Sequence, residues 1–156
     1  MHLLAYVIRP VLKDLRLWSL EAERLVLGTA CAESDCGRWL RQKGGGPALG
    51  IFQMEPSTHD DLFVNFLDHR HHIRRQVWNW RVNVEADARE LIWNIGYATA
   101  MCRVHYLRDP EPLPNTLVGQ AEYYKRVYNT HLGAGSAEGY IKKWRQFIPS
   151  GLESWE

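Results

Sequence analysis

The sequence predicts a mainly α-helical protein: one domain over residues 1–156, with about six helices and at most one small β-hairpin. Three observations favour this class. Apolar residues recur at helical spacing in several long segments. Cap residues such as Ser19 and Ser136 precede some of these segments, and stretches rich in glycine and proline separate them.

The first helix is expected to begin after Ser19 and to run to about Ser34, with Gly37 just beyond its end. Residues 43–50 contain three consecutive glycines and a proline, which predicts a loop or a tight hairpin. The apolar residues 51–54 that follow predict a brief strand or an extended segment.

Further helices are expected along the rest of the chain. Asn115 and Ser136 are predicted caps, and the proline-rich residues 109–114 end the longest helix. The expected ranges are 56 to about 67, 72–80, about 84–107, about 115–131 and 136 to about 147.

Composition narrows the functional class. Apolar residues make up 46% of the chain and the net charge is +1, whereas a nucleic-acid binder is usually more basic. The basic cluster at residues 69–75 is interpreted as a solvated helix face, with a polyanion contact as the alternative. The three cysteines, Cys31, Cys36 and Cys102, lack zinc-site spacing and are expected to be reduced thiols, so no metal or other cofactor is predicted.

Glu33 is the leading catalytic candidate. It stands at the predicted end of an apolar helix, just before the glycine-rich segment. The negative end of the helix dipole and apolar neighbours both disfavour a carboxylate charge, so they raise the pKa. A raised pKa is what a general acid needs near neutral pH.

Two further segments carry candidate polar groups. Gln53 is a polar residue in an apolar stretch, so if buried it needs a partner, either a backbone group or a sugar amide or hydroxyl. Tyr128 and Asn129 come just before residues 133–135, Gly-Ala-Gly, a pattern that is also common at an ordinary helix end.

Taken together, Glu33-Ser34, the stretch at 48–58 and Tyr128-Asn129 resemble the soluble-lytic-transglycosylase-like family of the lysozyme superfamily. The family pattern is Glu-Ser, then Gly-Ala-x-Gly-Leu-Met-Gln-x-Met-Pro-x-Thr, then Ala-Tyr-Asn-x-Gly. The resemblance covers about residues 19–147. Departures include Gly44, where the family often has a substrate-contacting serine, and Pro47, which replaces a glycine.

The resemblance implies a lysozyme-like fold and cleavage of peptidoglycan glycan strands with formation of 1,6-anhydro ends. In that reaction Glu33 serves as acid and then as base. Gln53 bonds the substrate, and Tyr128 lies close to the acid. Ser34 bonds the backbone of the glycine loop, and Asn129 holds the loop or the helix end.

Two alternative functions remain open. A hydrolytic muramidase needs a second carboxylate, for which Glu55, Asp60 and Asp61 are candidates by position in the chain. A non-catalytic glycan-binding or assembly module would use the same cleft without the acid.

The sequence shows no secretory signal and no run of 18 apolar residues. We therefore expect synthesis in the cytoplasm, no membrane span, and action on the cell wall as a phage lysis protein or virion component.

Overall fold

The computed structural model describes residues 2–85, 87–129 and 133–150. The chain is mainly helical, as predicted. In these residues β pairing is limited to isolated bridges from Leu49 to Arg41 and to Met54. The elements are, in order, η1 (Leu4–Ile8), α1 (Arg9–Asp14), α2 (Leu20–Ser34), α3 (Pro56–Asn65), η2 (Leu67–His69), α4 (His71–Asn79), η3 (Ala88–Ile92), α5 (Ile95–Leu107), α6 (Leu117–Tyr123), η4 (Tyr124–Asn129) and α7 (Ala137–Phe147).

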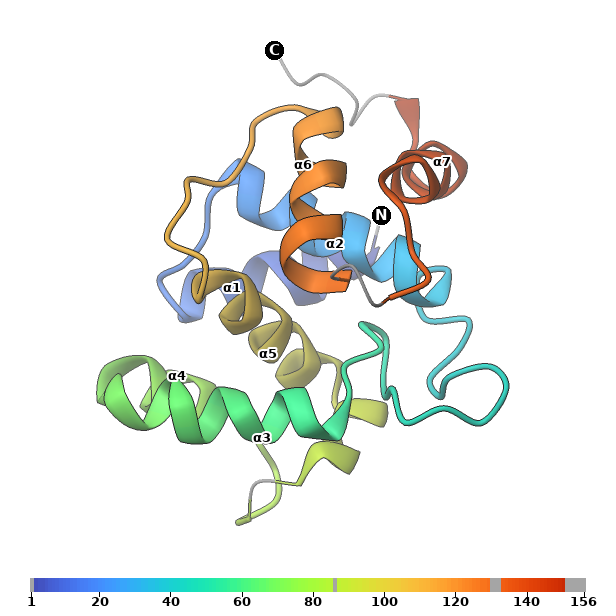
Figure 1. Ribbon diagram of the computed structural model, residues 1–156. Coiled ribbons are helices and arrows are strands. Elements are labelled where there is room, and N and C mark those ends of the chain that lie inside the picture. Colours follow the sequence, from blue (N-terminus) through green and yellow to red (C-terminus); the bar gives the residue numbers. More distant parts are fainter. Residues whose placement is uncertain (1, 86, 130–132, 151–156) are drawn as a thin grey trace.

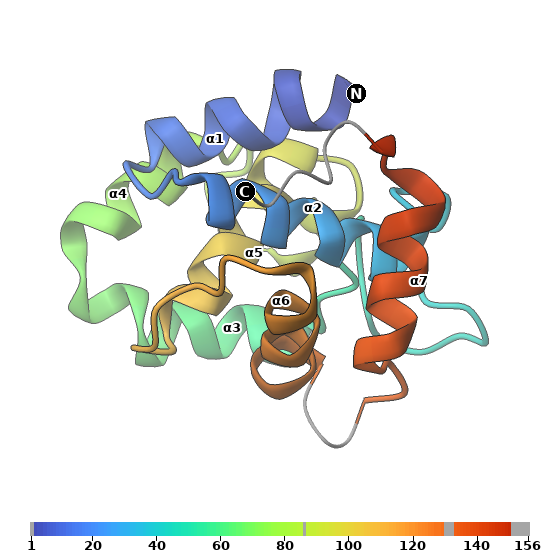
Figure 2. The same cartoon turned by 90° about the horizontal axis from the view of Figure 1, so that it is seen from above.

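Near its start the chain forms a helix, η1 followed by α1, that is absent from the sequence prediction. Leu4, Ile8, Val11 and Leu12 are buried on one face of it, and their spacing is helical. That face packs against α2 and α5, and Figure 2 shows the helix lying along one side of the molecule. The apolar start of the chain is therefore part of the core.

Helix α2 runs through the centre of the molecule (Figure 1) and has the predicted bounds. The Ser19 hydroxyl accepts a hydrogen bond from the Ala22 amide at 3.1 Å, which is the expected N-cap. Residues 22–31 are all buried, because other helices cover α2 on every side. At Gly28 a side chain would collide with the ring and hydroxyl of Tyr140, so this glycine lets α7 approach α2 closely.

The prediction of one helix over residues 84–107 is wrong for the first half of that range. The short 3-10 helix η3 and a break precede α5, which begins at Ile95. The side chain of Asn94 accepts from the amide of Tyr97 at 3.0 Å and caps α5. An asparagine that bonds the backbone in this way starts a new helix instead of continuing an old one.

The remaining helices lie on two sides of α5. In Figure 1, α3 and α4 lie below it, whereas α6 and α7 lie above it. Helix α3 ends at Asn65, two residues short of the predicted end. Thr116, not Asn115, caps α6 by accepting from the amide of Gly119 at 3.1 Å. Ser136 caps α7 as expected. The preceding helix was predicted to end near residue 131, and that position lies outside the described residues.

None of the described helices has the length and apolar character needed to cross a membrane.

Candidate active site

Glu33 lies on the last turn of α2, where the backbone turns sharply away. Asp35 and Cys36 take left-handed conformations, with φ of 53° and 58°. The Asp35 carboxylate pairs with the ammonium group of Lys143 on α7 at 2.6 Å. This ion pair ties the turn that follows Glu33 to α7, and the side chain of Glu33 is half-buried at the helix end.

Tyr124 is a hydrogen-bond partner of the acid. Its hydroxyl donates to Oε1 of Glu33 at 2.6 Å, across 91 positions of sequence. Tyr124 is itself buried and packs against Tyr140 with ring centroids 5.0 Å apart. The packing of α7 therefore holds the donor in place against the carboxyl group.

The π-helical segment η4 brings a second donor to the same carboxyl group. In a π-helix the backbone bonds residues five apart, so Asn129 lies little more than one turn beyond Tyr124 and both side chains reach the same carboxyl group. The side chain of Asn129 also hydrogen bonds to Glu33. In a regular α-helix these two residues would lie on different faces, so the local geometry of η4 assembles the site.

The electrostatic setting favours a neutral acid. Burial raises the pKa of Glu33 from 4.5 to about 7, and the hydrogen bonds from Tyr124 and Asn129 offset part of that rise. The carboxyl group is therefore protonated in a large share of molecules near neutral pH. This is the condition for proton donation that the sequence predicted for Glu33.

Ser34 contacts the backbone of the glycine loop, the contact that the family resemblance implies, and is not placed to bind substrate. Its hydroxyl donates to the carbonyl of Ile51 at 2.5 Å and accepts from the amide of Gly37 at 2.8 Å. Because Ser34 is fully buried, it does not line a substrate surface. Its role is to fix residues 44–53 against the end of α2.

Gln53 lies in a tight turn with φ of +47°. Its side-chain amide donates to the carbonyl of Gly50 at 2.8 Å, so its partner is a backbone group, the more ordinary of the two expected alternatives. At Gly50 a side chain would meet the carbonyl oxygen of Leu91 at 2.0 Å, and only glycine lets the turn approach η3 this closely.

Tyr128 lies close enough to Glu33 to interact with it electrostatically, but it does not make the direct contact with the acid that was expected for it. The predicted partner of the acid is replaced by Tyr124, one helical turn earlier, and the hydroxyl of Tyr128 instead donates to the carbonyl of Phe52 at 2.9 Å. Tyr128 thus ties η4 to the turn at residues 50–53. The sequence contains tyrosines at both positions, and it is the packing and register of η4 that select Tyr124.

The three carboxylates considered for a second catalytic role are engaged elsewhere. Asp60 bonds to His59 at 2.8 Å, and Asp61 pairs with Arg108 at 2.5 Å. Glu55 lies on the surface and accepts weakly from Ser57 at 3.5 Å. None of these three forms a hydrogen bond with Glu33 or with its partners Tyr124 and Asn129.

Two thiols flank Glu33. The left-handed turn brings Cys36 back onto Cys31, and their sulfur atoms lie 2.7 Å apart although both cysteines are free. The sequence predicted reduced thiols at these two positions, and both cysteines are free. In the folded chain the turn itself brings the two side chains together.

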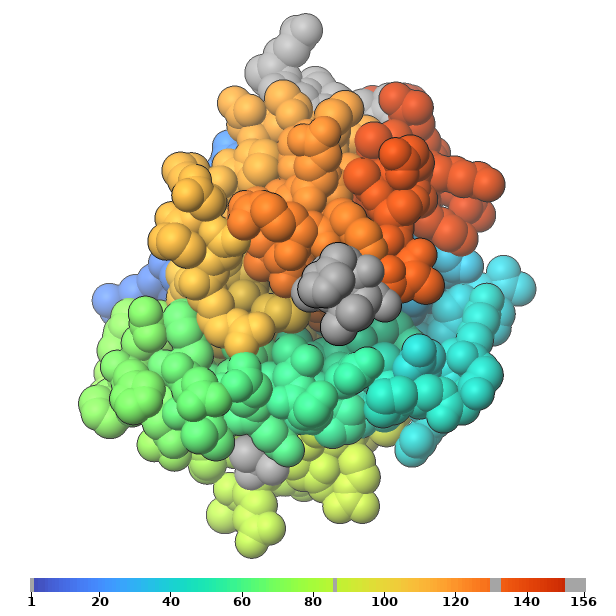
Figure 3. Space-filling model, in the orientation of Figure 1, coloured from blue at the N-terminus to red at the C-terminus, as the bar shows by residue number. Residues whose placement is uncertain are grey.

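The surroundings of the site are formed by segments far apart in sequence. On the face drawn in Figure 3, α3 and the loop after α2 form the lower half, and α6, η4 and α7 form the upper half.

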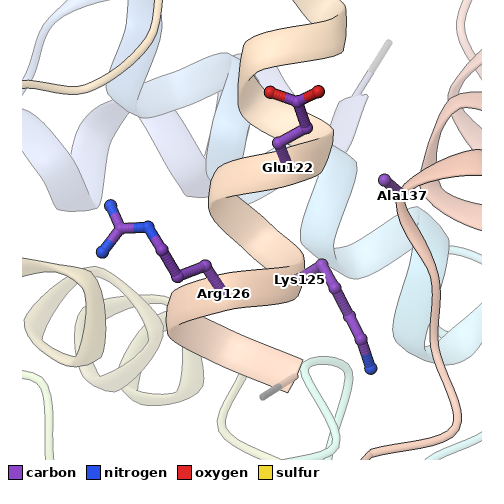
Figure 4. A pocket seen from close by; sticks show the side chains of 4 residues that line it. All are labelled: Glu122, Lys125, Arg126 and Ala137. Carbon is purple, nitrogen blue, oxygen red and sulfur yellow. The ribbon is translucent and has the colours of Figure 1, made fainter. Parts of the chain in front are cut away.

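A separate hollow of about 410 Å³ lies on the outer side of η4 and does not include Glu33. Its lining residues, drawn in Figure 4, are Glu122, Lys125, Arg126 and Ala137.

Searches against family models, curated proteins and solved structures found no match to this chain. Within residues 2–85, 87–129 and 133–150, no three histidine, cysteine, aspartate or glutamate side chains are grouped so as to hold a metal ion.

Proposed function

We propose that this protein cleaves peptidoglycan glycan strands as a lytic transglycosylase, with Glu33 as the acid and then the base. The observation that carries the proposal is the setting of Glu33. It is a half-buried carboxyl group, with a pKa near 7, that Tyr124 holds from a helix 91 positions away. The sequence motifs around Glu33, Gln53 and Asn129 supply the substrate class.

The proposed first step is proton donation. Tyr124 donates to Oε1 of Glu33, so we assign the acidic proton to the other oxygen, Oε2. That proton passes to the glycosidic oxygen between N-acetylmuramic acid and N-acetylglucosamine. The bond from this oxygen to C1 of the muramic acid then breaks, and the electron pair leaves with the oxygen.

The second step closes a ring. The carboxylate of Glu33 takes the proton of the 6-hydroxyl of the same muramic acid while the O6 atom bonds to C1. The N-acetyl group of the sugar supports the positive charge at C1 between the two steps. Since attacking atom and reacting carbon belong to one sugar, positioning lowers the barrier by up to about 7–11 kcal/mol.

The contacts of Asp60 and Asp61 give no support to hydrolysis by a carboxylate pair. Retaining and inverting hydrolases place a second carboxylate within about 5–10 Å of the acid. Here Asp60 and Asp61 hydrogen bond to His59 and Arg108 instead of to the groups around Glu33.

The test is mass spectrometry of the fragments released from purified peptidoglycan. The wild type should release anhydro-ended fragments that are one water lighter than hydrolysis products. Glu33→Gln should release none, whereas Glu138→Gln, which changes an exposed glutamate of α7, should behave as wild type. Reducing-end products would make the enzyme a hydrolase, and binding without any cleavage would make it a glycan-binding module.

A further inference from the structure

Lys125 makes two contacts close to the candidate acid without touching the acid itself. Its ammonium group donates to Oδ1 of Asn129 at 2.9 Å and to the carbonyl of Gly133 at 2.8 Å. Figure 4 shows its side chain extending toward the carboxyl end of the helix, whereas Arg126 points to another side. Lys125 therefore links η4 to the segment that leads to α7.

The first contact determines the orientation of the Asn129 amide. A carboxamide can present either its oxygen or its NH₂ group to a neighbour, and its surroundings decide which. Because the ammonium group of Lys125 can only donate, it requires the oxygen of Asn129 on its own side. The NH₂ group is then left facing the opposite way.

Gly135 shows where that NH₂ group lies. A Cβ atom built on Gly135 would be 2.8 Å from Nδ2 of Asn129 and 2.7 Å from the hydroxyl of Tyr124. The NH₂ group of Asn129 and the hydroxyl of Tyr124 thus lie beside each other, and Tyr124 is the residue that donates to Glu33. Within the part of the chain that the structure describes, two donors face the carboxyl group, and Lys125 holds one of them in that orientation.

Among the described residues, the titratable groups that interact electrostatically with Glu33 are Tyr124 and Tyr128 on η4 and Cys102 on α5. Burial raises the pKa of all three well above its ordinary value, so they stay neutral at the pH values at which Glu33 titrates. A change in the titration of Glu33 after substitution of Lys125 would therefore come from Lys125, either through its charge or through the orientation of Asn129, and an Asn129→Ala background separates these two routes.

We propose that Lys125 is a positioning residue for the proposed acid: it holds the Asn129 amide so that the NH₂ group, and not the oxygen, faces Glu33. The inference rests on the proposed role of Glu33. Without Lys125 the amide is free to rotate and to present its oxygen, which cannot donate to a carboxylate. The charged form of the acid then loses one of its two donors.

The test is Lys125→Met, which keeps the length of the side chain and removes the donor. We expect kcat/KM for glycan cleavage to fall about tenfold through kcat, and the alkaline limb of its pH profile to move up by about half a pH unit. Lys125→Arg should restore most of the rate. Lys142→Met, on an exposed position of α7, is the matched control and should leave both quantities unchanged.

Two further measurements separate positioning from a merely structural role. In an Asn129→Ala background, Lys125→Met should have no additional effect on the pH profile, because its route to Glu33 is already removed. The pKa of Glu33 should also be followed by carbon-13 NMR titration of its carboxyl group, which requires no activity. An unchanged pKa in Lys125→Met would overturn the inference.

The NMR titration also separates the two proposals. If the wild type cleaves no peptidoglycan but the pKa of Glu33 moves in Lys125→Met, the proposed function fails and the positioning by Lys125 stands. If the wild type cleaves peptidoglycan but the pKa of Glu33 does not change in Lys125→Met, the proposed function stands and the positioning by Lys125 fails.

Discussion

The two ends of α2 carry glutamates in opposite electrostatic situations. Glu23, on the first turn, is buried and accepts two hydrogen bonds of 2.7 Å from the guanidinium group of Arg9 and one from the indole of Trp18. Glu33, on the last turn, accepts from neutral groups, the hydroxyl of Tyr124 and the amide of Asn129. Glu23 is buried and Glu33 is half-buried, but only Glu23 has a cationic partner among these contacts.

The difference appears in the pKa values. Burial acts to raise the pKa of Glu23, but the hydrogen bonds and charge of Arg9, together with the indole of Trp18, bring the pKa below its ordinary value. Burial dominates at Glu33 and raises its pKa to about 7. The helix dipole acts in the same two directions, since it stabilises an anion at the first turn and disfavours one at the last.

The comparison shows how one residue type on one helix acquires two roles. A buried carboxylate that is paired with a cation joins two elements, here α1 and α2. A buried carboxyl group that is held by neutral donors keeps its proton near neutral pH and is available for proton transfer. The partners, more than the degree of burial, decide which role a glutamate has.

The largest expected effect is loss of activity on neutralising the acid. Glu33→Gln should lower kcat/KM for cleavage of purified peptidoglycan by about 100-fold or more, because it removes the proton donor. The free energy of unfolding in urea should not fall. Activity within tenfold of wild type would show that Glu33 is not the catalytic acid, and its difference from Glu23 would then have no role in the reaction.

The next effect is on the pH dependence of stability. The folded chain raises the pKa of Glu33 from 4.5 to about 7, so the wild type loses stability as the pH rises through this window. Relative to Glu33→Gln, the loss should reach about 3 kcal/mol above pH 8, at about 1.4 kcal/mol per pKa unit. Urea unfolding of both proteins from pH 4 to pH 8 measures this difference, and a constant difference would contradict it.

Glu23 should show the opposite behaviour. Because the pKa of Glu23 is lowered in the folded chain, its contribution to stability is fully present at pH values above the ordinary pKa of glutamate. That contribution is lost as the pH falls through the lower pKa of the folded chain. Glu23→Gln should cost about 2 kcal/mol at pH 7, because charged hydrogen bonds to Arg9 and Trp18 are weakened. Activity per folded molecule should be unchanged. Denaturant unfolding and an activity assay on the same sample test both statements.

The smallest effect concerns the donor to Glu33. Tyr124→Phe removes the hydroxyl, so the pKa of Glu33 should rise further and kcat/KM should fall about tenfold. The matched control is Tyr123→Phe, which removes a buried hydroxyl that has no hydrogen-bond partner among the described residues. Equal losses in both variants would show that the hydroxyl of Tyr124 has no specific role at the acid.

Much of the fold could be predicted because helix ends are encoded locally. Ser19 and Ser136 cap helices where the sequence indicated, since the groups involved lie within three residues of each other. The two main errors arise where local rules compete. Asn94 was assigned to a helix interior but starts α5, and the helix through η1 and α1 was missed because its apolar face was not recognised.

The candidate site could be predicted only in part. Glu33 and the contact of Ser34 with the glycine loop follow from short stretches of sequence. The choice of Tyr124 over Tyr128 does not, because it depends on the π-helical register of η4 and on how η4 packs against α2 and α5. A shift of four residues along a helix preserves an apolar face, so the pattern of residues does not distinguish the two tyrosines.

The sequence by itself determined a mainly helical chain, the positions of several helix ends and a glutamate next to a glycine-rich turn. The tertiary structure decided what surrounds that glutamate: the hydroxyl of Tyr124, the amide that Lys125 orients, and the burial that raises the pKa to about 7. The physical reason is the separation in sequence of the groups that interact. Capping and helix formation depend on neighbours a few residues apart, whereas burial and pKa depend on groups that only the packing of α2, η4 and α7 brings together.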